Sequence, residues 1–309
     1  QNMFLELKNT TIGHQTPLIK DVNTTLELGD TCLLVGNNGV GKTTLIKSIL
    51  NQISALEGEL FLGGKNLKTL SNKEIAEQIA VVFSKSQIPA NYTVTDLISL
   101  GKYIHYPYYF ELNDADKKHV EVIIENLNLT QYRNFSLHQL SDGNLQKAFI
   151  GRALAQNSPM IILDEPTTHL DEENKIIILK LLRKLAKNQN KLILFSSHDW
   201  RLSKEFASKM WFIHNEKLEA GITEDILLKN DELLNPQLFH LDEEFSPPYI
   251  DAPSLEKEML YSFLQKNFRK NLSSYKFEWK GTFWVISKPN FQQNCDSFAD
   301  LSHIIENLR

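Results

Sequence analysis

The chain has 309 residues, enough for one large domain and a smaller one, and its 42% hydrophobic and 23% charged residues are ordinary for a folded protein. The net charge of −5 provides no general attraction to nucleic acid or to an anionic membrane, and two cysteines are too few for a disulfide framework. No run reaches the roughly 18 apolar residues that a membrane-spanning helix needs.

Short apolar segments alternate with turns at the start of the chain. Residues 4–9 alternate like a half-buried strand, residues 18–28 favour a strand pair, and the apolar run 32–35 favours a central parallel strand. A helix is predicted after residue 44, because apolar side chains recur there at helical spacing: Leu45, Ile46, Ile49, Leu50 and Ile53. Strand, glycine-rich loop and helix therefore follow one another.

The alternation of strands and helices continues to about residue 213. Residues 58–64 indicate a hairpin, residues 79–83 a buried strand, and residues 94–140 a mostly helical region. Further buried strands are predicted, with helices between them, at 160–163, 192–195 and 211–213. This order predicts an α/β core around a largely parallel sheet.

The composition changes near residue 241. Residues 241–253 carry four acids and three prolines, which predicts an extended linker. Beyond it, apolar spacing predicts helices at both ends of the remaining segment and a hairpin around Lys280-Gly281. We therefore expect residues 254–309 to form a small α-β-β-α domain.

The loop after the strand at 32–35 has the composition of a phosphate-binding P-loop. Gly36, Gly39 and Gly41 allow the backbone to curl so that successive N–H groups face phosphate oxygens. Lys42 supplies a positive charge for the β- and γ-phosphates, and the Thr43 hydroxyl suits Mg²⁺. The predicted nucleotide-binding residues are Gly36, Asn37, Asn38, Gly39, Val40, Gly41, Lys42, Thr43 and Thr44.

A pair of carboxylates follows the apolar strand at 160–163. Acids at the carboxyl end of a buried strand lie where α/β sheets gather their ligands. Asp164 is expected to reach the metal, directly or through water, and Glu165 to polarise the attacking water. A solvated turn is the weaker alternative, because four apolar residues directly precede the pair.

Together with further motifs in order, these segments resemble the ATP-binding subunit of an ABC transporter over residues 3 to about 235. The resemblance identifies Asp171 in the loop after the carboxylates, within THLD, and His198 as the switch histidine, within SSHDW. The signature loop of the family, usually LSGGQ, reads LSDGN here: Leu140, Ser141, Asp142, Gly143 and Asn144.

The resemblance implies a P-loop ATPase fold over residues 3–240, with an antiparallel β subdomain and a helical subdomain at about 85–145. It implies ATP and Mg²⁺ as cofactors and a head-to-tail dimer, in which ATP is held between one P-loop and the signature loop of the second copy. Asp171 would bridge the two sites, and His198 would hold the γ-phosphate and orient the catalytic Glu165.

Two positions depart from the family pattern. The family normally has a glutamine that offers its side-chain oxygen to Mg²⁺ where this chain has Ser84, and Gln87 follows three residues later. Either residue can serve the metal, and Ser84 is the favoured candidate. His14 stands where the family stacks an aromatic ring on adenine; a histidine in a turn, without a ligand, is the alternative.

A narrower resemblance points to the importers of iron-siderophore complexes, haem and vitamin B12. It rests on a pattern at Thr93, Val94, Leu97, Gly101, Lys102 and Tyr103. It implies permease subunits as partners, indirectly a substrate-binding protein, and a peripheral location at the cytoplasmic face of the inner membrane. Aromatic residues crowd the implied docking groove, where docking and burial remain alternatives: Tyr92, Tyr103, Tyr106, Tyr108, Tyr109 and Phe110.

Other members of the family remain alternatives. Importers or exporters of other cargo share these motifs, as do soluble ATPases that act in DNA repair or on ribosomes. Repair members insert long coiled coils before the carboxylates, whereas only 122 positions separate Lys42 from Asp164. Ribosome-acting members usually carry two cassettes, so no nucleic-acid partner is expected.

The aromatic content of residues 254–309 exceeds that of a solvated tail and indicates packing on a core, a neighbouring cassette or a dimer partner. A contact between cassettes, or a regulatory role, is the favoured interpretation.

Overall fold

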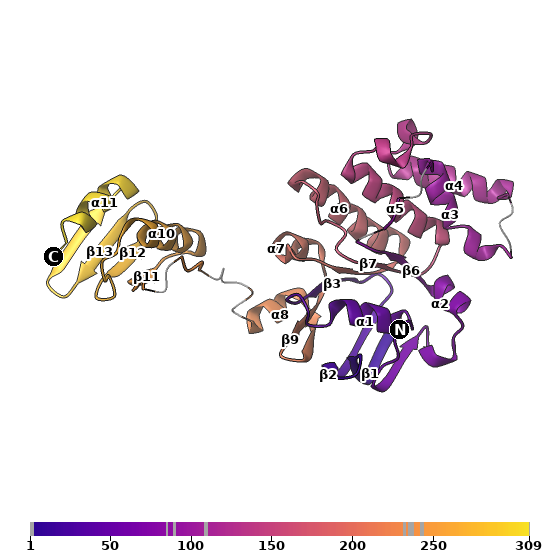
Figure 1. Ribbon diagram of the computed structural model, residues 1–309, viewed down its shortest axis with the longest axis horizontal. Coiled ribbons are helices and arrows are strands. Elements are labelled where there is room, and N and C mark those ends of the chain that lie inside the picture. Colours follow the sequence, from indigo (N-terminus) through magenta and orange to yellow (C-terminus); the bar gives the residue numbers. More distant parts are fainter. Residues whose placement is uncertain are drawn as a thin grey trace. The chain divides into compact units, whose positions relative to one another are not determined.

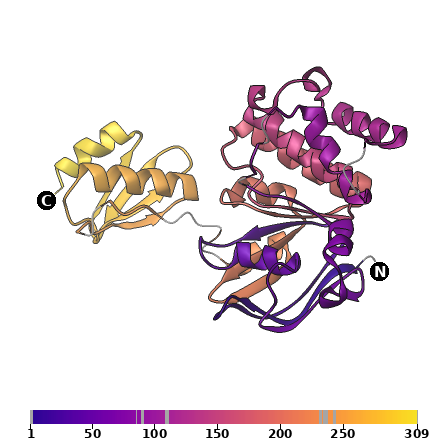
Figure 2. The ribbon, with the colours of Figure 1, turned by 45° about the vertical axis from the view of Figure 1, so that its right-hand side comes forward.

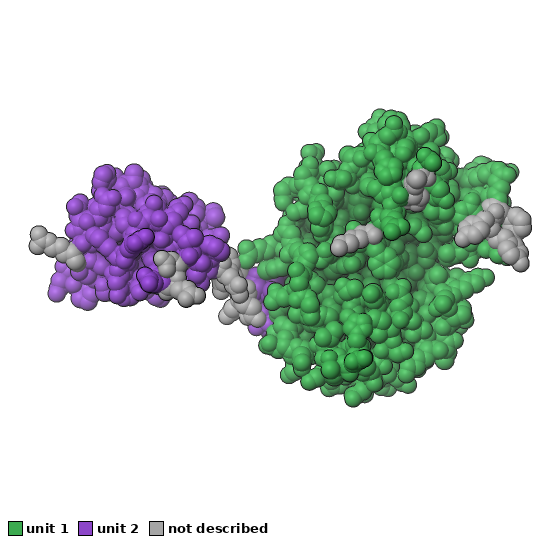
Figure 3. Space-filling model, in the orientation of Figure 1, with its two compact units in different colours: residues 1–226 green, residues 227–309 purple. Residues whose placement is uncertain are grey.

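The computed structural model describes residues 3–84, 86–88, 91–107, 111–230, 233, 238–241 and 244–308. It divides into two compact units, Gln1–Ile226 and Leu227–Arg309 (Figure 3). Among the described helices, none combines the length and the hydropathy needed to cross a membrane.

The first unit contains two sheets. The four-stranded antiparallel sheet has the order β2-β1-β4-β5, with β1 at Met3–Gly13, β2 at Pro17–Glu27, β4 at Glu57–Leu62 and β5 at Lys65–Asn66. The six-stranded sheet has the order β10-β9-β3-β8-β7-β6, with β3 at Thr31–Val35, β6 at Ile79–Val82, β7 at Met160–Leu163, β8 at Leu192–Ser196, β9 at Lys209–His214 and β10 at Lys217–Ile222. Only β10 is antiparallel to its neighbour in this second sheet.

Helices connect these strands. They are α1 at Lys42–Ile49, α2 at Asn72–Gln78, α3 at Val94–Leu100, α4 at Asp114–Asn126, α5 at Asp142–Gln156, α6 at Glu172–Gln189, α7 at Trp200–Ser203 and α8 at Thr223–Lys229. Figure 1 shows α3, α4 and α5 together on one side of the six-stranded sheet. This arrangement is the mixed, largely parallel core with β and helical subdomains that the resemblance implied.

Helix α1 lies between the two sheets (Figure 1). Its apolar residues Leu45, Ile46 and Ile49 are buried in one cluster with side chains from both sheets. Burial of these side chains stabilises the start of α1 against β3. The loop that joins the two elements is therefore anchored at both ends.

The predicted strand pair at 18–28 is instead the single strand β2. Asp21 has a φ of 52° in this strand, which pairs with β1 through register shifts. An irregular strand with β-bulges and a pair of short strands produce the same broken alternation in the sequence. Buried Ile19, Val22 and Leu26 hold β2 on the core.

The second unit is one four-stranded sheet with helices beside it (Figure 2). Its elements are β11 at Tyr249–Asp251, α10 at Ser254–Asn267, β12 at Lys276–Trp279, β13 at Trp284–Lys288, β14 at Phe291–Cys295 and α11 at Phe298–Glu306. Tyr275, Phe277 and Trp284 are buried in a cluster with apolar residues of both helices. These aromatic side chains therefore pack on the unit's own core.

Two strands of this sheet differ from the α-β-β-α prediction. β11 lies within the predicted linker and pairs parallel with β12, and β14 pairs antiparallel with β13. Ile250 is the only large apolar residue in β11 that is buried, and the middle of β14 is Gln292, Gln293 and Asn294. Edge strands with so few apolar positions leave little periodic signal in the sequence.

Candidate functional site: a phosphate-binding loop beside two carboxylates

The loop between β3 and α1 has the backbone expected of a phosphate cradle. Gly39 and Gly41 have φ values of 81° and 115°, a left-handed region that favours glycine, and Gly41 is the N-cap of α1. The Lys42 ammonium donates a hydrogen bond to the Gly36 carbonyl at 2.7 Å. The loop therefore presents a helix N-terminus and a lysine to one region, which suits an anion.

Lys42 also lies within electrostatic reach of the carboxylates that follow β7. Its side chain is buried, and this burial lowers the pKa of the Lys42 ammonium, while the charges of Glu165 and Asp164 act in the opposite direction. The fold thus brings together two motifs that are 122 positions apart in the sequence. A cationic group facing two anionic groups is suited to a ligand that carries both phosphate and a divalent cation.

The carboxylates are fixed at the end of the parallel sheet. The Asp164 amide donates to the Val82 carbonyl at 2.9 Å, which continues the β6–β7 pairing by one residue. Glu165 has a φ of 52°, and its Oε1 lies 2.5 Å from Nε2 of His198, which follows β8. The side chain of Glu165 is largely shielded and that of His198 is half exposed, so the pair faces the surface.

Sequence analysis missed one residue of this region. Ser196, the last residue of β8, contacts both Asp164 and Glu165 through its hydroxyl group. A signal was present, because a polar residue follows the apolar run 192–195 just as Asp164 follows the run 160–163. Only the pairing of β7 with β8 places the two positions side by side.

His14 lies in the turn between β1 and β2, exposed to solvent. Its Nε2 is 3.5 Å from the hydroxyl of Thr44, a buried residue in the first turn of α1. Thr43, the residue before it, is exposed. The fold therefore brings His14 next to the first turn of α1, beside the loop that joins it to β3.

The signature loop forms the N-terminus of α5. Ser141 is the N-cap, and its hydroxyl accepts a hydrogen bond from the Asn144 amide at 3.2 Å. Gly143 is buried against α6, where a Cβ atom would lie 2.5 Å from Oδ1 of Asn174. Asp171 caps α6 by accepting from the Asn174 amide at 2.9 Å. Asn174 therefore connects the signature loop to the cap of α6.

A small pocket of about 180 Å³ joins the segment after β6 to these two loops. Ser84, Asp142 and His169 contribute to its lining, together with the α5 residues Leu145, Gln146 and Phe149. Gln87, which is exposed, does not line it. Ser84 therefore places the segment after β6 beside α5, the helix that begins at the signature loop.

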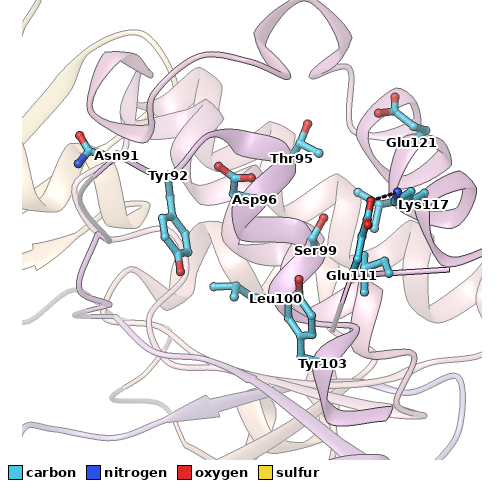
Figure 4. Close-up of a pocket in the computed structure, with 12 residues that line it drawn as sticks. Asn91, Tyr92, Thr95, Asp96, Ser99, Leu100, Tyr103, Glu111, Lys117 and Glu121 are labelled. Atoms are coloured by element: carbon cyan, nitrogen blue, oxygen red, sulfur yellow. Dashed lines mark hydrogen bonds and ion pairs between the residues drawn. The ribbon is translucent and has the colours of Figure 1, made fainter. Parts of the chain in front are cut away.

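A larger pocket of about 660 Å³ lies among α3, α4 and the segments around them (Figure 4). Tyr92 and Tyr103 line it and are partly buried, and the ion pair of Lys117 with Glu111 at 2.7 Å lies at its wall. Tyr106, also partly buried, donates to the Asp116 carboxylate. The remaining predicted aromatic residues, Tyr108, Tyr109 and Phe110, lie outside the described residues.

Comparison with known proteins identifies the family. A family model described as ABC transporter matches residues 19–168. An uncharacterized ABC transporter ATP-binding protein of Methanocaldococcus jannaschii is 34% identical over 75% of this chain and 80% of its own length. The iron(3+)-hydroxamate import ATP-binding protein FhuC of Bacillus subtilis is 33% identical over 74% of this chain and 84% of its own.

A solved structure agrees with these relatives. A chain of a metal-chelate type ABC transporter in an inward-facing conformation superposes with a TM-score of 0.65 at 28% identity, over 73% of this chain and 86% of that chain. Together with the order of the motifs and the geometry of the loop, the comparisons establish that this chain belongs to the ABC transporter family, as one of its ATP-binding proteins.

Proposed function

We propose that this chain is the ATP-hydrolysing subunit of an ABC importer that takes up an iron chelate, such as a siderophore complex or haem, or vitamin B12. The relatives whose names state a cargo support this, since they include import proteins for iron(3+)-hydroxamate and petrobactin and a ferric enterobactin transport protein. The observation that carries the proposal is the Glu165–His198 pair, held 2.5 Å apart beside Lys42 and Asp164.

The residues of the site divide the chemistry among them. Lys42 and the backbone of residues 36–44 hold the phosphates of ATP, and Glu165 accepts a proton from the attacking water. His198 orients the Glu165 carboxylate and contacts the γ-phosphate. These roles fit the geometry, because the carboxylate and the lysine lie at the same edge of the sheet.

The donor set of the site suits Mg²⁺. Hydroxyl and carboxylate oxygens are the ligands that Mg²⁺ prefers, and the Thr43 hydroxyl and the Asp164 carboxylate supply both kinds. Bound there, Mg²⁺ neutralises charge on the phosphates. Ser84 is the third proposed oxygen donor. It lines the small pocket together with Asp142, so this donor would lie beside the N-terminus of α5.

A second copy of the chain completes the site. The signature loop, residues 140–144, would contact the γ-phosphate bound to the other copy, and Asp171 would lie between the two sites. The N-terminus of α5, where Ser141 already orders the first turn, provides backbone N–H groups for this contact. ATP then stabilises the joined state, and hydrolysis releases it.

The importer also requires permease subunits, which place this chain at the cytoplasmic face of the inner membrane, and through them a substrate-binding protein. The pocket of about 660 Å³, with Tyr92 and Tyr103 in its wall, supports a docking role for the helical subdomain. Aromatic residues are enriched in protein interfaces, and Tyr92 and Tyr103 supply them here.

Substituting Glu165→Gln tests this function. Loss of the proton acceptor should lower kcat for ATP by about 10²- to 10⁴-fold while ATP binding persists. Since hydrolysis no longer separates the copies, the variant should form a stable dimer in ATP, measured by light scattering after size exclusion. In cells that lack the native gene, wild type should restore uptake of an iron chelate and Glu165→Gln should not. Full ATPase activity in the variant would contradict the role of Glu165, and unrestored uptake by the wild type would contradict the cargo.

A further inference from the structure

Strands β7 and β8 end side by side at the edge of the sheet where the carboxylates lie. In this parallel pair Leu163 lies opposite Phe195, so the next positions, Asp164 and Ser196, are also neighbours. Ser196 is 1% exposed. A buried hydroxyl at this place must find hydrogen-bond partners, because an unpaired polar group inside a protein is costly.

The Ser196 hydroxyl is paired on both of its sides. It donates its proton to Oδ1 of Asp164 at 3.0 Å and accepts the N–H of Glu165 at 2.9 Å. One side chain thus fixes the carboxylate of the first acid and the backbone of the second. Both partners lie 31 or 32 positions away in the sequence.

The contact with Glu165 restrains an unusual backbone conformation. Glu165 has a φ of 52°, in the left-handed region that residues other than glycine rarely adopt. The hydrogen bond to Ser196 holds the Glu165 amide in that conformation. From it, the Glu165 side chain reaches His198, which lies two residues after Ser196, beyond the end of β8.

We propose that Ser196 is a positioning residue for ATP hydrolysis, an inference that rests on the function proposed above. By holding Oδ1 of Asp164, it leaves Oδ2 as the oxygen for the cation, and by holding the amide of Glu165 it aims that carboxylate at the attacking water. Groups that orient a metal ligand typically change metal affinity or activity by roughly 10- to 100-fold when removed.

The adjacent Ser197 supplies a matched control. It is 3% exposed, and its hydroxyl accepts a hydrogen bond from Ser203 at 3.0 Å. Ser196→Ala and Ser197→Ala therefore each remove one buried hydroxyl at the end of β8, but only the first removes the contacts with the Asp164 carboxylate and the Glu165 amide. Ser196→Thr retains the hydroxyl, and Ser196→Cys retains the size with a weaker donor.

The test measures cation binding apart from turnover. In the Glu165→Gln background, which holds ATP without hydrolysing it, Mn²⁺ replaces Mg²⁺ and its affinity is measured by electron paramagnetic resonance. Ser196→Ala should weaken Mn²⁺ binding roughly 10- to 100-fold, and Ser196→Thr should restore it. ATP binding in EDTA and the thermal midpoint should stay near those of Ser197→Ala. With Glu165 intact, kcat should fall more than KM for ATP changes.

Equal Mn²⁺ affinity in Ser196→Ala and its parent, or an equal loss in Ser197→Ala, would overturn the proposal. If Ser196→Ala does not fold, Ser196→Cys takes its place, and unchanged Mn²⁺ affinity in that variant overturns the proposal equally. An Asp164→Asn variant separates this result from a failure of the proposed function. Full Mn²⁺ affinity in Asp164→Asn would refute the metal role of Asp164 itself, whatever Ser196 does.

Discussion

Gly101 marks a close approach between two helices of the first unit. It is the C-cap of α3, and a Cβ atom there would lie 2.0 Å from the Arg152 carbonyl oxygen of α5 and 2.9 Å from Cβ of Ala155. These neighbours belong to the backbone and to a short side chain, so neither can rotate away. The absence of a side chain at this position is what allows α3 to pack on α5.

Gly101→Ala should therefore lower the free energy of unfolding of the first unit by about 1–3 kcal/mol, because overpacking forces the helices apart. Gly143→Ala is the matched control. The nearest neighbours of a Cβ atom at Gly143 are side-chain atoms of Asn174, which can rotate, so this variant should lose less free energy of unfolding. Urea unfolding followed by circular dichroism measures both. Equal losses would show that the contact of α3 with α5 relaxes easily.

At the same scale, residues differ in how far the sequence predicts them. The order of glycines in the P-loop predicted its turn, because left-handed conformations depend on the residue type at each position. The polar residue after the run 192–195 placed Ser196 at a strand end, but its contacts could not be predicted, because they depend on two strands 32 positions apart meeting in register. The roles of Ser84 and His14 stay predictions, which alanine substitution of each residue can test.

At the scale of elements, α4 is tied to the segment after α3 by a partly buried polar cluster. Lys102, 6% exposed, contacts the His119 ring through Nζ and lies 3.8 Å from the Asp116 carboxylate. Burial lowers the pKa of His119 below its usual 6.5; the charge of Lys102 and, more weakly, that of Lys191 act in the same direction, and Asp116 acts against them. Protonation of His119 is thus disfavoured in the folded protein.

This cluster should make stability depend on pH. Since the folded protein holds His119 at a lowered pKa, the unfolded chain binds more protons once the pH falls below about 6.5, and stability is lost as the pH falls further through the folded pKa. Thermal unfolding from about pH 7.5 to pH 5.5 should show this loss, and His119→Gln should reduce its slope. His105→Gln, which alters an exposed histidine nearby, is the control. An unchanged slope in His119→Gln would exclude this cluster as the cause.

At the scale of the whole molecule, the second unit has the features of an independent domain. Its core contains Phe277 and Ile286 from the sheet, Leu260 and Leu264 from α10 and Leu301 from α11, all 0% exposed. The Lys270 ammonium also donates to the carbonyls of Ile305, Glu306 and Leu308 at the end of α11. These contacts all lie within the unit.

Residues 227–309 should accordingly fold when expressed alone, with a cooperative thermal transition in circular dichroism. Phe277→Ala in this fragment should cost about 3–5 kcal/mol and abolish the transition, because it empties the centre of the core. Tyr249→Ala, at an exposed position of β11, should leave it nearly unchanged. A fragment without a transition would show that the second unit needs the first unit to fold.

The role of the second unit in regulation or in contact between cassettes stays a prediction. ATPase and dimerisation assays of the chain without this unit would test it.

The sequence by itself determined the family and the order of strand, loop and helix around the P-loop, and it predicted which residues hold the phosphates. The comparisons confirm the family, because its motifs are local runs whose chemistry is fixed by residue type and spacing. Only the tertiary structure decided that Lys42 lies within electrostatic reach of Asp164 and Glu165, that the Ser196 hydroxyl bonds the Asp164 carboxylate and the Glu165 amide, and that β11 and β14 complete the sheet of the second unit. These are contacts between strands or loops far apart in the chain, and their partners are selected by register and burial, which no local pattern records.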